Sequence, residues 1–277
     1  MRQYYLIFIL FFTNCFCVQS QDKPKHFDVL GLYTAKNDLA HISFVKEANT
    51  WFAKMARQHG FTYSPSQDWD DLNADTLKKY EVIIFLDTRP DSMEHRKAFE
   101  QYMKNGGAWM GFHFAAFALT PSLYPQNWDW YHNEFLGSGA YSGNTWRPTA
   151  ATLAIEGPDH PIARNIPEKF VSSPNEWYKW EKDLRKNPDI KVLVSIDPES
   201  FPLGTDPKPH EIWHEGYFPV VWTNTRYRMV YFNMGHNDMD YEGKTNRALS
   251  STFQNEIQDR LILNALCWLG TGLTAEK

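Results

Sequence analysis

The sequence contains only three cysteines in 277 residues, too few for a fold stabilised by disulfides. Two of them, Cys15 and Cys17, lie in a segment that we interpret as a cleaved leader, so the mature chain keeps only Cys267. One cysteine cannot form an intramolecular disulfide, and the apolar run ILNALCWLG around Cys267 indicates a buried side chain rather than a reactive thiol. The fold must therefore be stabilised by a hydrophobic core, and roughly 257 mature residues suffice for one large domain.

The sequence also lacks a hydrophobic run long enough to cross a bilayer, which takes about 20 residues as a helix. Arg2, an apolar run over residues 4–12 and a small or polar stretch up to Ser20 are typical of a secretory signal peptide. We expect residues 1–20 to be removed and the protein to be exported to the periplasm. Cys15 and Cys17 raise the alternative of a lipoprotein anchor, although the three residues before Cys15 are poor for that signal.

No basic tract is present, and charges of both signs are mixed along the chain, with 28 Lys and Arg against 33 Asp and Glu. This distribution argues against nucleic acid and anionic membrane surfaces as partners. Aromatic residues are abundant instead, with 11 Trp and 14 Tyr. Several lie in polar company, as in the run NWDWYH at 127–132, and aromatic faces beside hydrogen-bonding groups suit sugar rings. For any single aromatic residue, packing in the core or at its rim is the alternative.

The first half of the chain alternates between apolar runs and amphipathic periodic segments. Strands are predicted at residues 28–33, 61–63, 81–87 and 108–117, and helices at 44–58, 72–79 and 91–105. This alternation predicts a parallel sheet with right-handed crossovers, whose strands end at one crevice. The run AWMGFHFAAF at 108–117 places His113 at a sharp turn after a buried strand.

The second half of the chain differs in composition. Residues 120–144 are rich in Trp, Tyr, Gly, Asn and Pro and are predicted to be an insertion lying over the crevice. Further strands are predicted at 150–155, 191–196, 218–223 and 229–234, and a final helix at 253–269. A Pro-rich loop at 201–214 carries His210, Glu211 and His214.

Five motifs resemble those of the ThuA-like (trehalose utilisation) family. They are His41 in a loop after the first strand, Gly-x-His-x-Ala at 111–115, Asp-His-Pro at 159–161, Asn-Glu-Trp-Tyr at 175–178 and Gly-His at 235–236. The resemblance implies that residues 21–277 form a single ThuA-like domain of the α/β class. It implies a flavodoxin-like parallel sheet flanked by helices, similar to class I glutamine amidotransferases, with aromatic-rich loop insertions over the C-terminal strand edge. His113 replaces the nucleophilic cysteine of the amidotransferase elbow, so glutamine amidotransferase activity is not expected.

Three histidines, His41, His113 and His236, each follow a predicted strand and should converge at one sheet edge near Glu176. Imidazole nitrogens with an open coordination position would suit a divalent metal such as Zn, held by the three histidines. Without a metal, His113, His236 and Glu176 would form an acid–base cluster. The sequence leaves both interpretations open, and the cofactor is unknown.

Other residues are predicted to line a carbohydrate pocket. They are His41, Trp128, Trp130, Asn144, Trp177, Tyr178, His214 and Asp238. Asn144 stands where many family members carry a histidine in a Gly-x-Phe-x-x-His run. Asp238 could orient His236 or bind sugar hydroxyls, whereas His160 is expected mainly to brace its turn.

The sequence therefore indicates a protein of carbohydrate utilisation that acts on a disaccharide or a glycoside oxidised at the 3-position. Removal of the acidified C2 proton would expel the C1 substituent, and an isomerase acting on the same keto-sugar would use similar groups. Two alternatives are a non-catalytic sugar-binding protein, because the elbow nucleophile is lost, and a hydrolase that uses metal-bound water.

Overall fold

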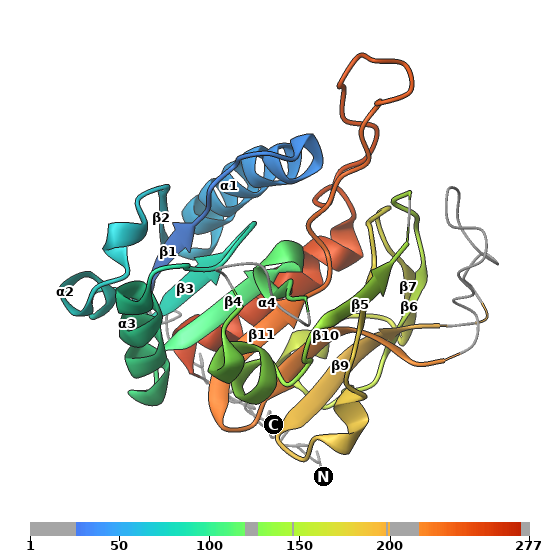
Figure 1. The fold of residues 1–277 in the computed structure, drawn as a ribbon. Helices are drawn as coiled ribbons and strands as arrows, with labels where there is room; N and C mark the ends of the chain where they lie inside the picture. Colours follow the sequence, from blue (N-terminus) through green and yellow to red (C-terminus); the bar gives the residue numbers. More distant parts are fainter. Residues whose placement is uncertain (1–25, 120–126, 146, 198, 200–215, 273–277) are drawn as a thin grey trace, which may run out of the picture.

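The computed structural model describes residues 26–119, 127–145, 147–197, 199 and 216–272, so the predicted leader and His214 lie outside the described residues. A nine-stranded sheet forms the centre of the molecule (Figure 1). One half is parallel, in the order β2 (Thr62–Ser66), β1 (Asp28–Leu32), β3 (Val82–Phe85), β4 (Ala108–Phe112) and β11 (Tyr227–Phe232). This order is that of flavodoxin-like folds. The predicted α/β fold class is confirmed.

The other half of the sheet is antiparallel, a feature that the predicted parallel arrangement does not include. It continues from β11 through β10 (Phe218–Asn224), β9 (Ile190–Ile196), β6 (Thr152–Ile155) and β7 (Lys169–Val171). The two strands expected at 218–223 and 229–234 are the hairpin β10–β11. This hairpin joins the two halves, because β11 pairs parallel with β4 and antiparallel with β10.

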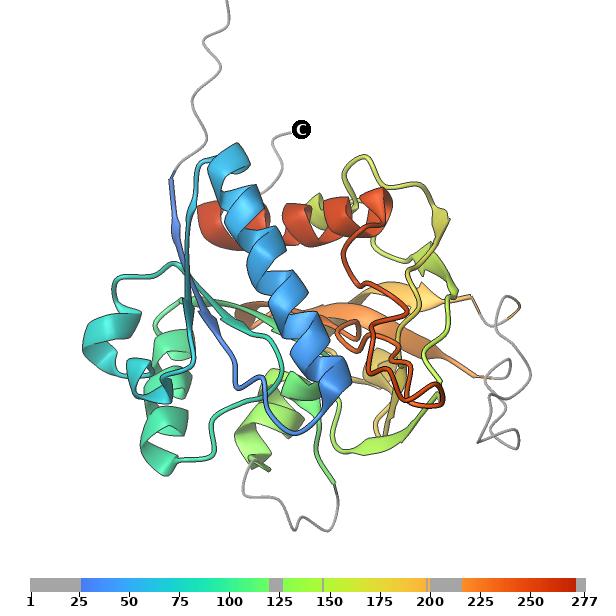
Figure 2. The same ribbon diagram turned by 90° about the horizontal axis from the view of Figure 1, so that it is seen from above.

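Helices cover both faces of the sheet (Figure 2). Helices α1 (Leu39–His59) and α4 (Glu256–Thr271) pack on one face, and α2 (Ala74–Leu77) and α3 (Met93–Lys104) on the other. Successive side chains of a strand point to opposite faces, so Phe112 of β4 packs with α1 and α4, whereas Trp109 packs with α3. Among the described residues, no helix is both long and apolar enough to span a bilayer.

Helix α1 begins earlier than the periodicity predicts, at Leu39 instead of residue 44. The Asp38 carboxylate caps this end by accepting a hydrogen bond from the Ala40 amide at 2.8 Å, which satisfies a backbone donor that has no partner within the helix. The helix ends at Gly60, which has a left-handed φ of 73°. His41 therefore lies in the first turn of α1, and its placement in a loop was wrong.

The described part of the 120–144 insertion divides between two places. The helical turn η3 (Trp130–Phe135) packs on the α3 face of the sheet. Strand β5 (Tyr141–Asn144) instead pairs antiparallel with β8 (Tyr178–Trp180) in a separate two-stranded sheet. Both segments contact the edge where the predicted histidines meet, because the Tyr131 hydroxyl of η3 donates to Ala115 O and the Asn144 amide of β5 donates to Glu176 Oε1.

Candidate active site

The site is built around an elbow between β4 and the 3-10 turn η2 (His113–Ala116). His113 has a φ of 39°, in the left-handed region that non-glycine residues seldom adopt. Such strain persists only where the surrounding structure enforces it, and it is common at functional sites. Gly111 is required here because a Cβ atom would lie 2.0 Å from the Trp109 ring.

Three side chains hold this elbow by donating hydrogen bonds to its carbonyl oxygens. The Tyr231 hydroxyl donates to His113 O at 2.8 Å, and the Tyr131 hydroxyl to Ala115 O at 3.0 Å. The guanidinium of Arg89 donates to Phe114 O at 3.1 Å. These residues were not predicted, because nothing local in the sequence links residues 89, 131 and 231 to the turn at 113.

The two nitrogens of the His113 imidazole face different groups. Its Nδ1 lies 3.3 Å from the carbonyl oxygen of Asn233, which can only accept, so this contact places a proton on Nδ1. The lone pair of the neutral ring is then at Nε2, which lies 3.3 Å from Glu176 Oε2. Tyr178 packs against the ring with centroids 3.9 Å apart. Nε2 is therefore the basic atom of His113, and it faces a carboxylate.

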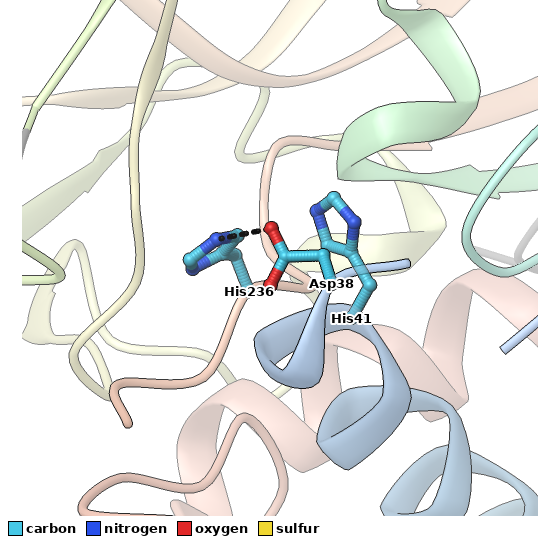
Figure 3. Close-up of side chains that lie close together, drawn as sticks. All are labelled: Asp38, His41 and His236. Atoms are coloured by element: carbon cyan, nitrogen blue, oxygen red, sulfur yellow. Dashed lines mark ion pairs between the residues drawn. The ribbon is translucent and has the colours of Figure 1, made fainter. Parts of the chain in front are cut away.

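The three predicted histidines do converge. Ring centroids lie 5.5 Å apart for His41 and His113, 5.0 Å for His41 and His236, and 5.4 Å for His113 and His236. His236 follows β11, and its Nε2 lies 3.8 Å from Glu176 Oε2. The sequence reasoning missed Asp38, whose Oδ2 lies 3.7 Å from the same Nε2 (Figure 3). An Asp three residues before His41 at a helix start was the available signal.

Burial and charge separate the protonation behaviour of these groups. Burial lowers the pKa of His113, and Glu176 only partly offsets this effect. Burial holds the pKa of His41 well below its usual value, and protonation of the neighbouring His236 or His113 would lower it further. Burial alone would lower the pKa of His236 too, but its contact with Asp38 and the nearby Glu176 carboxylate raise it. The pKa values of neighbouring imidazoles are thus shifted in opposite directions, an arrangement found in acid–base sites.

The loop that carries Glu176 is attached to the end of β11 through Asn175. This fully buried side chain accepts a hydrogen bond from the Gly235 amide at 3.1 Å and donates to Ser173 O at 3.1 Å. The Asn144 amide donates to Glu176 Oε1. Asn144 and Tyr178 thus lie at the site, as predicted.

Other predicted residues lie elsewhere. Trp128 and Trp130 pack in the hydrophobic layer with Phe99 of α3, and Trp177 is fully buried with its indole donating to Thr149 O at 2.8 Å. Packing, the alternative weighed for each aromatic, is the role that the structure shows for all three tryptophans. The polar residues next to these tryptophans in the sequence do not indicate which face of the sheet the tryptophans cover.

Two further polar residues form partnerships of their own. Asp238 forms an ion pair with Arg147 at 2.9 Å, so Asp38, and not Asp238, is the carboxylate beside His236. His160 caps a short turn by accepting from the Ile162 amide at 3.4 Å, and it packs against Trp268 of α4. As expected, it braces a turn.

Comparison with known proteins identifies relatives of this arrangement. The chain matches the family model described as ThuA, trehalose utilisation, over residues 29–269. A ThuA-like protein from Bacteroides uniformis ATCC 8492 is 36% identical, with 88% of this chain and 91% of that chain covered and a TM-score of 0.75. A ThuA-like protein from Parabacteroides merdae ATCC 43184 shares the fold at 18% identity, with 91% and 93% covered and a TM-score of 0.60. No functionally curated protein matches the chain. The family match over most of the chain and the 36% identical structure show that this protein belongs to the ThuA (trehalose utilisation) family.

Proposed function

We propose that this protein is an exported enzyme that cleaves a 3-keto-glycoside by acid–base chemistry at His113, Glu176 and His236. The observation that carries the proposal is the strained elbow, which presents the basic Nε2 of His113 3.3 Å from Glu176 in a buried site. Membership of a family described by trehalose utilisation supports a carbohydrate substrate. A strained, fully supported imidazole is more than a packing residue needs.

The reaction would begin at C2 of the oxidised sugar, where the neighbouring ketone acidifies the proton. Nε2 of His113 takes this proton, and the electrons of the C2–H bond become the C1–C2 double bond. The bond between C1 and the glycosidic oxygen breaks, and this oxygen gains a proton as it leaves with the alcohol. The products are the free alcohol and an unsaturated 3-keto-sugar, so the atoms balance without an oxidant or a reductant.

The remaining groups would stabilise the ketone oxygen and protonate the leaving oxygen. A positive centre at His236, between the Asp38 and Glu176 carboxylates, would stabilise negative charge on the ketone oxygen. Glu176 lies 3.3 Å from His113 and 3.8 Å from His236. It can therefore relay the proton from His113 toward the leaving oxygen. An isomerase would instead return the proton to a neighbouring carbon.

An NMR time course with the purified protein tests this proposal, using a 3-keto-disaccharide and the parent disaccharide. We expect cleavage of the keto-sugar only. General acid–base groups contribute about 10²- to 10⁴-fold to rate, so His113→Ala and Glu176→Gln should each lose at least about 100-fold in kcat. His95→Gln, at a partly buried histidine of α3 paired with Asp70, is the matched control and should retain full activity.

Two other outcomes would indicate a different function for the protein. Line broadening of the sugar without turnover would indicate a non-catalytic sugar-binding protein. A new keto-sugar of unchanged mass would indicate isomerisation. Export is tested separately by N-terminal sequencing of the mature protein, which should begin after Ser20.

A further inference from the structure

A second set of ligand-type atoms lies beside the acid–base pair. Asp38, His41 and His236 each offer one atom, and these atoms lie within 4.8 Å of one another. Figure 3 shows the two imidazole rings on either side of the Asp38 carboxylate. Zinc bonds of about 2.0–2.1 Å in tetrahedral geometry place two ligand atoms roughly 3.4 Å apart. Small side-chain rotations would therefore bring these three atoms onto one ion.

One histidine of the cluster has a nitrogen without a partner in the described structure. His41 is only 8% exposed, and its Nε2 atom makes no hydrogen bond to any described residue. Leaving such a buried polar atom unpaired costs free energy. A ligand at the cluster would remove this cost, and imidazole nitrogen is a good donor to first-row transition metals.

The charges around the cluster also favour a bound cation. Nε2 of His236 lies 3.7 Å from Asp38 and 3.8 Å from Glu176, so two carboxylates face one imidazole. Glu176 is buried, whereas the Asp38 side chain is 42% exposed. A buried carboxylate needs a compensating positive charge. Protonation of His236 would supply one positive charge, whereas a divalent ion would supply two.

We propose that Asp38, His41 and His236 bind one divalent transition-metal ion, with zinc as the first candidate. Two histidines and one carboxylate form a donor set that zinc and iron enzymes use with a coordination position left open. This set differs from the three histidines expected from the sequence, because the ligand-type atoms that lie within 4.8 Å of one another belong to Asp38, His41 and His236 and do not include a nitrogen of His113. His113 therefore remains available as the base.

The scaffold holds the ligands from two sides. Asp38 and His41 begin α1, and His236 follows β11. Oδ1 of Asp38 is used by the Ala40 amide and the Tyr241 hydroxyl, which leaves Oδ2, the atom nearest His236, for the ion. Asp87 fixes the loop before Asp38 by accepting from the Thr34 amide at 2.7 Å and the Ala35 amide at 2.6 Å. Such outer contacts orient metal ligands.

The ion would supply the positive centre that the proposed mechanism requires. Three protein ligands leave a position for the ketone oxygen of the sugar, next to His113 and Glu176. This catalytic role rests on the proposed function. The binding site itself does not, because its geometry, its unpaired nitrogen and its charge are independent of the substrate.

Metal binding is measured on the sugar-free protein after treatment with a chelator and dialysis. Zinc is then added, and bound metal is counted by mass spectrometry, with Co²⁺ absorption as a second reading. We expect about one ion per chain in the wild type. Asp38→Asn, which keeps the helix cap, and His236→Gln should each weaken zinc binding at least tenfold. His113→Ala and the control His95→Gln in α3 should bind zinc as the wild type does.

Far-UV circular dichroism checks that each variant is folded. If His236→Gln does not fold, Asp38→Asn alone tests the proposal. The proposal is overturned if the wild type binds no zinc or cobalt, which would leave protonated His236 as the cation. It is equally overturned if Asp38→Asn binds zinc with unchanged affinity, or if His113→Ala abolishes binding. A wild-type protein that binds one ion but does not cleave the 3-keto-disaccharide would instead count against the proposed function alone.

Discussion

Gly235 allows the segments that carry His113 and His236 to approach more closely than any residue with a Cβ atom would allow. Its φ is 138°, and a Cβ atom there would lie 3.0 Å from the Cβ of His113 and 3.3 Å from the Phe44 ring. The His113 Cβ is fixed to the strained elbow and cannot rotate away. Gly235→Ala should therefore disturb His113 and His236 together.

The magnitude follows from two contributions. A non-glycine residue in a sparsely populated region of φ and ψ costs about 1–3 kcal/mol, and overpacking a rigid neighbour adds about 1–3 kcal/mol. We expect Gly235→Ala to lower the free energy of unfolding by about 3 kcal/mol in total. Gly60→Ala is the matched control, since Gly60 also has a positive φ, of 73°, but nothing within 4 Å of a Cβ. It should lose only about 1 kcal/mol.

Guanidinium unfolding at pH 7 gives both free energies, and histidine ring NMR signals report the site. Gly235→Ala should shift the signals of His113 and His236 and reduce keto-sugar turnover at least tenfold, whereas Gly60→Ala should change neither. Equal losses of stability in the two variants, with unchanged histidine signals, would refute the close approach as the reason for this glycine.

Three further substitutions test the supporting structure. Asn175→Ala leaves the Gly235 amide without its acceptor and should cost about 2–3 kcal/mol of unfolding free energy, with a loss of kcat; an unchanged denaturation midpoint would contradict this. Tyr231→Phe removes the 2.8 Å bond to His113 O, and calorimetry should show a loss of about 1–2 kcal/mol; no loss would mean that this bond does not hold the elbow. Burial raises the pKa of Asp259 from 3.8 to about 6, so its carboxylate destabilises the fold above pH 6, and this effect disappears as the pH falls toward 3.8. Asp259→Asn should therefore add about 1 kcal/mol at pH 8, after a discount for the screening of this half-buried group, and nothing at pH 3.8; unfolding at both pH values tests this sign.

Local patterns predicted most strands of the central sheet, because β1, β3, β4 and β11 in the parallel half and β6, β9 and β10 in the antiparallel half lie in apolar runs between turn and helix signals. The short strands were missed. Strand β7 has only three residues, and β5 and β8, which form the separate sheet, are similarly short. Their pairing depends on partners far away in the sequence, so no local periodicity marks them. The early start of α1 depended on one capping residue, Asp38, which a search for apolar periodicity does not weigh.

At the site, too, local sequence marks some residues, whereas others are placed only by distant contacts. His113, His236 and Glu176 were identified because strand ends and family motifs mark them, and parallel strands bring their C-terminal ends to one edge. Trp128 and Trp130 were assigned to the pocket from composition alone. Composition does not say which face of a sheet an aromatic residue covers, and the tertiary structure places both in the α3 layer.

The positions of most strands along the chain and the turn at His113 thus follow from the sequence itself, because hydrophobic runs and turn residues act over a few neighbouring positions. Only the tertiary structure decided that Asp38 stands beside His236, that Asp238 pairs with Arg147, and that Tyr231 and Arg89 hold the elbow. These contacts join residues tens to hundreds of positions apart. They are set by how the helices and strands pack, which no single stretch of the chain encodes.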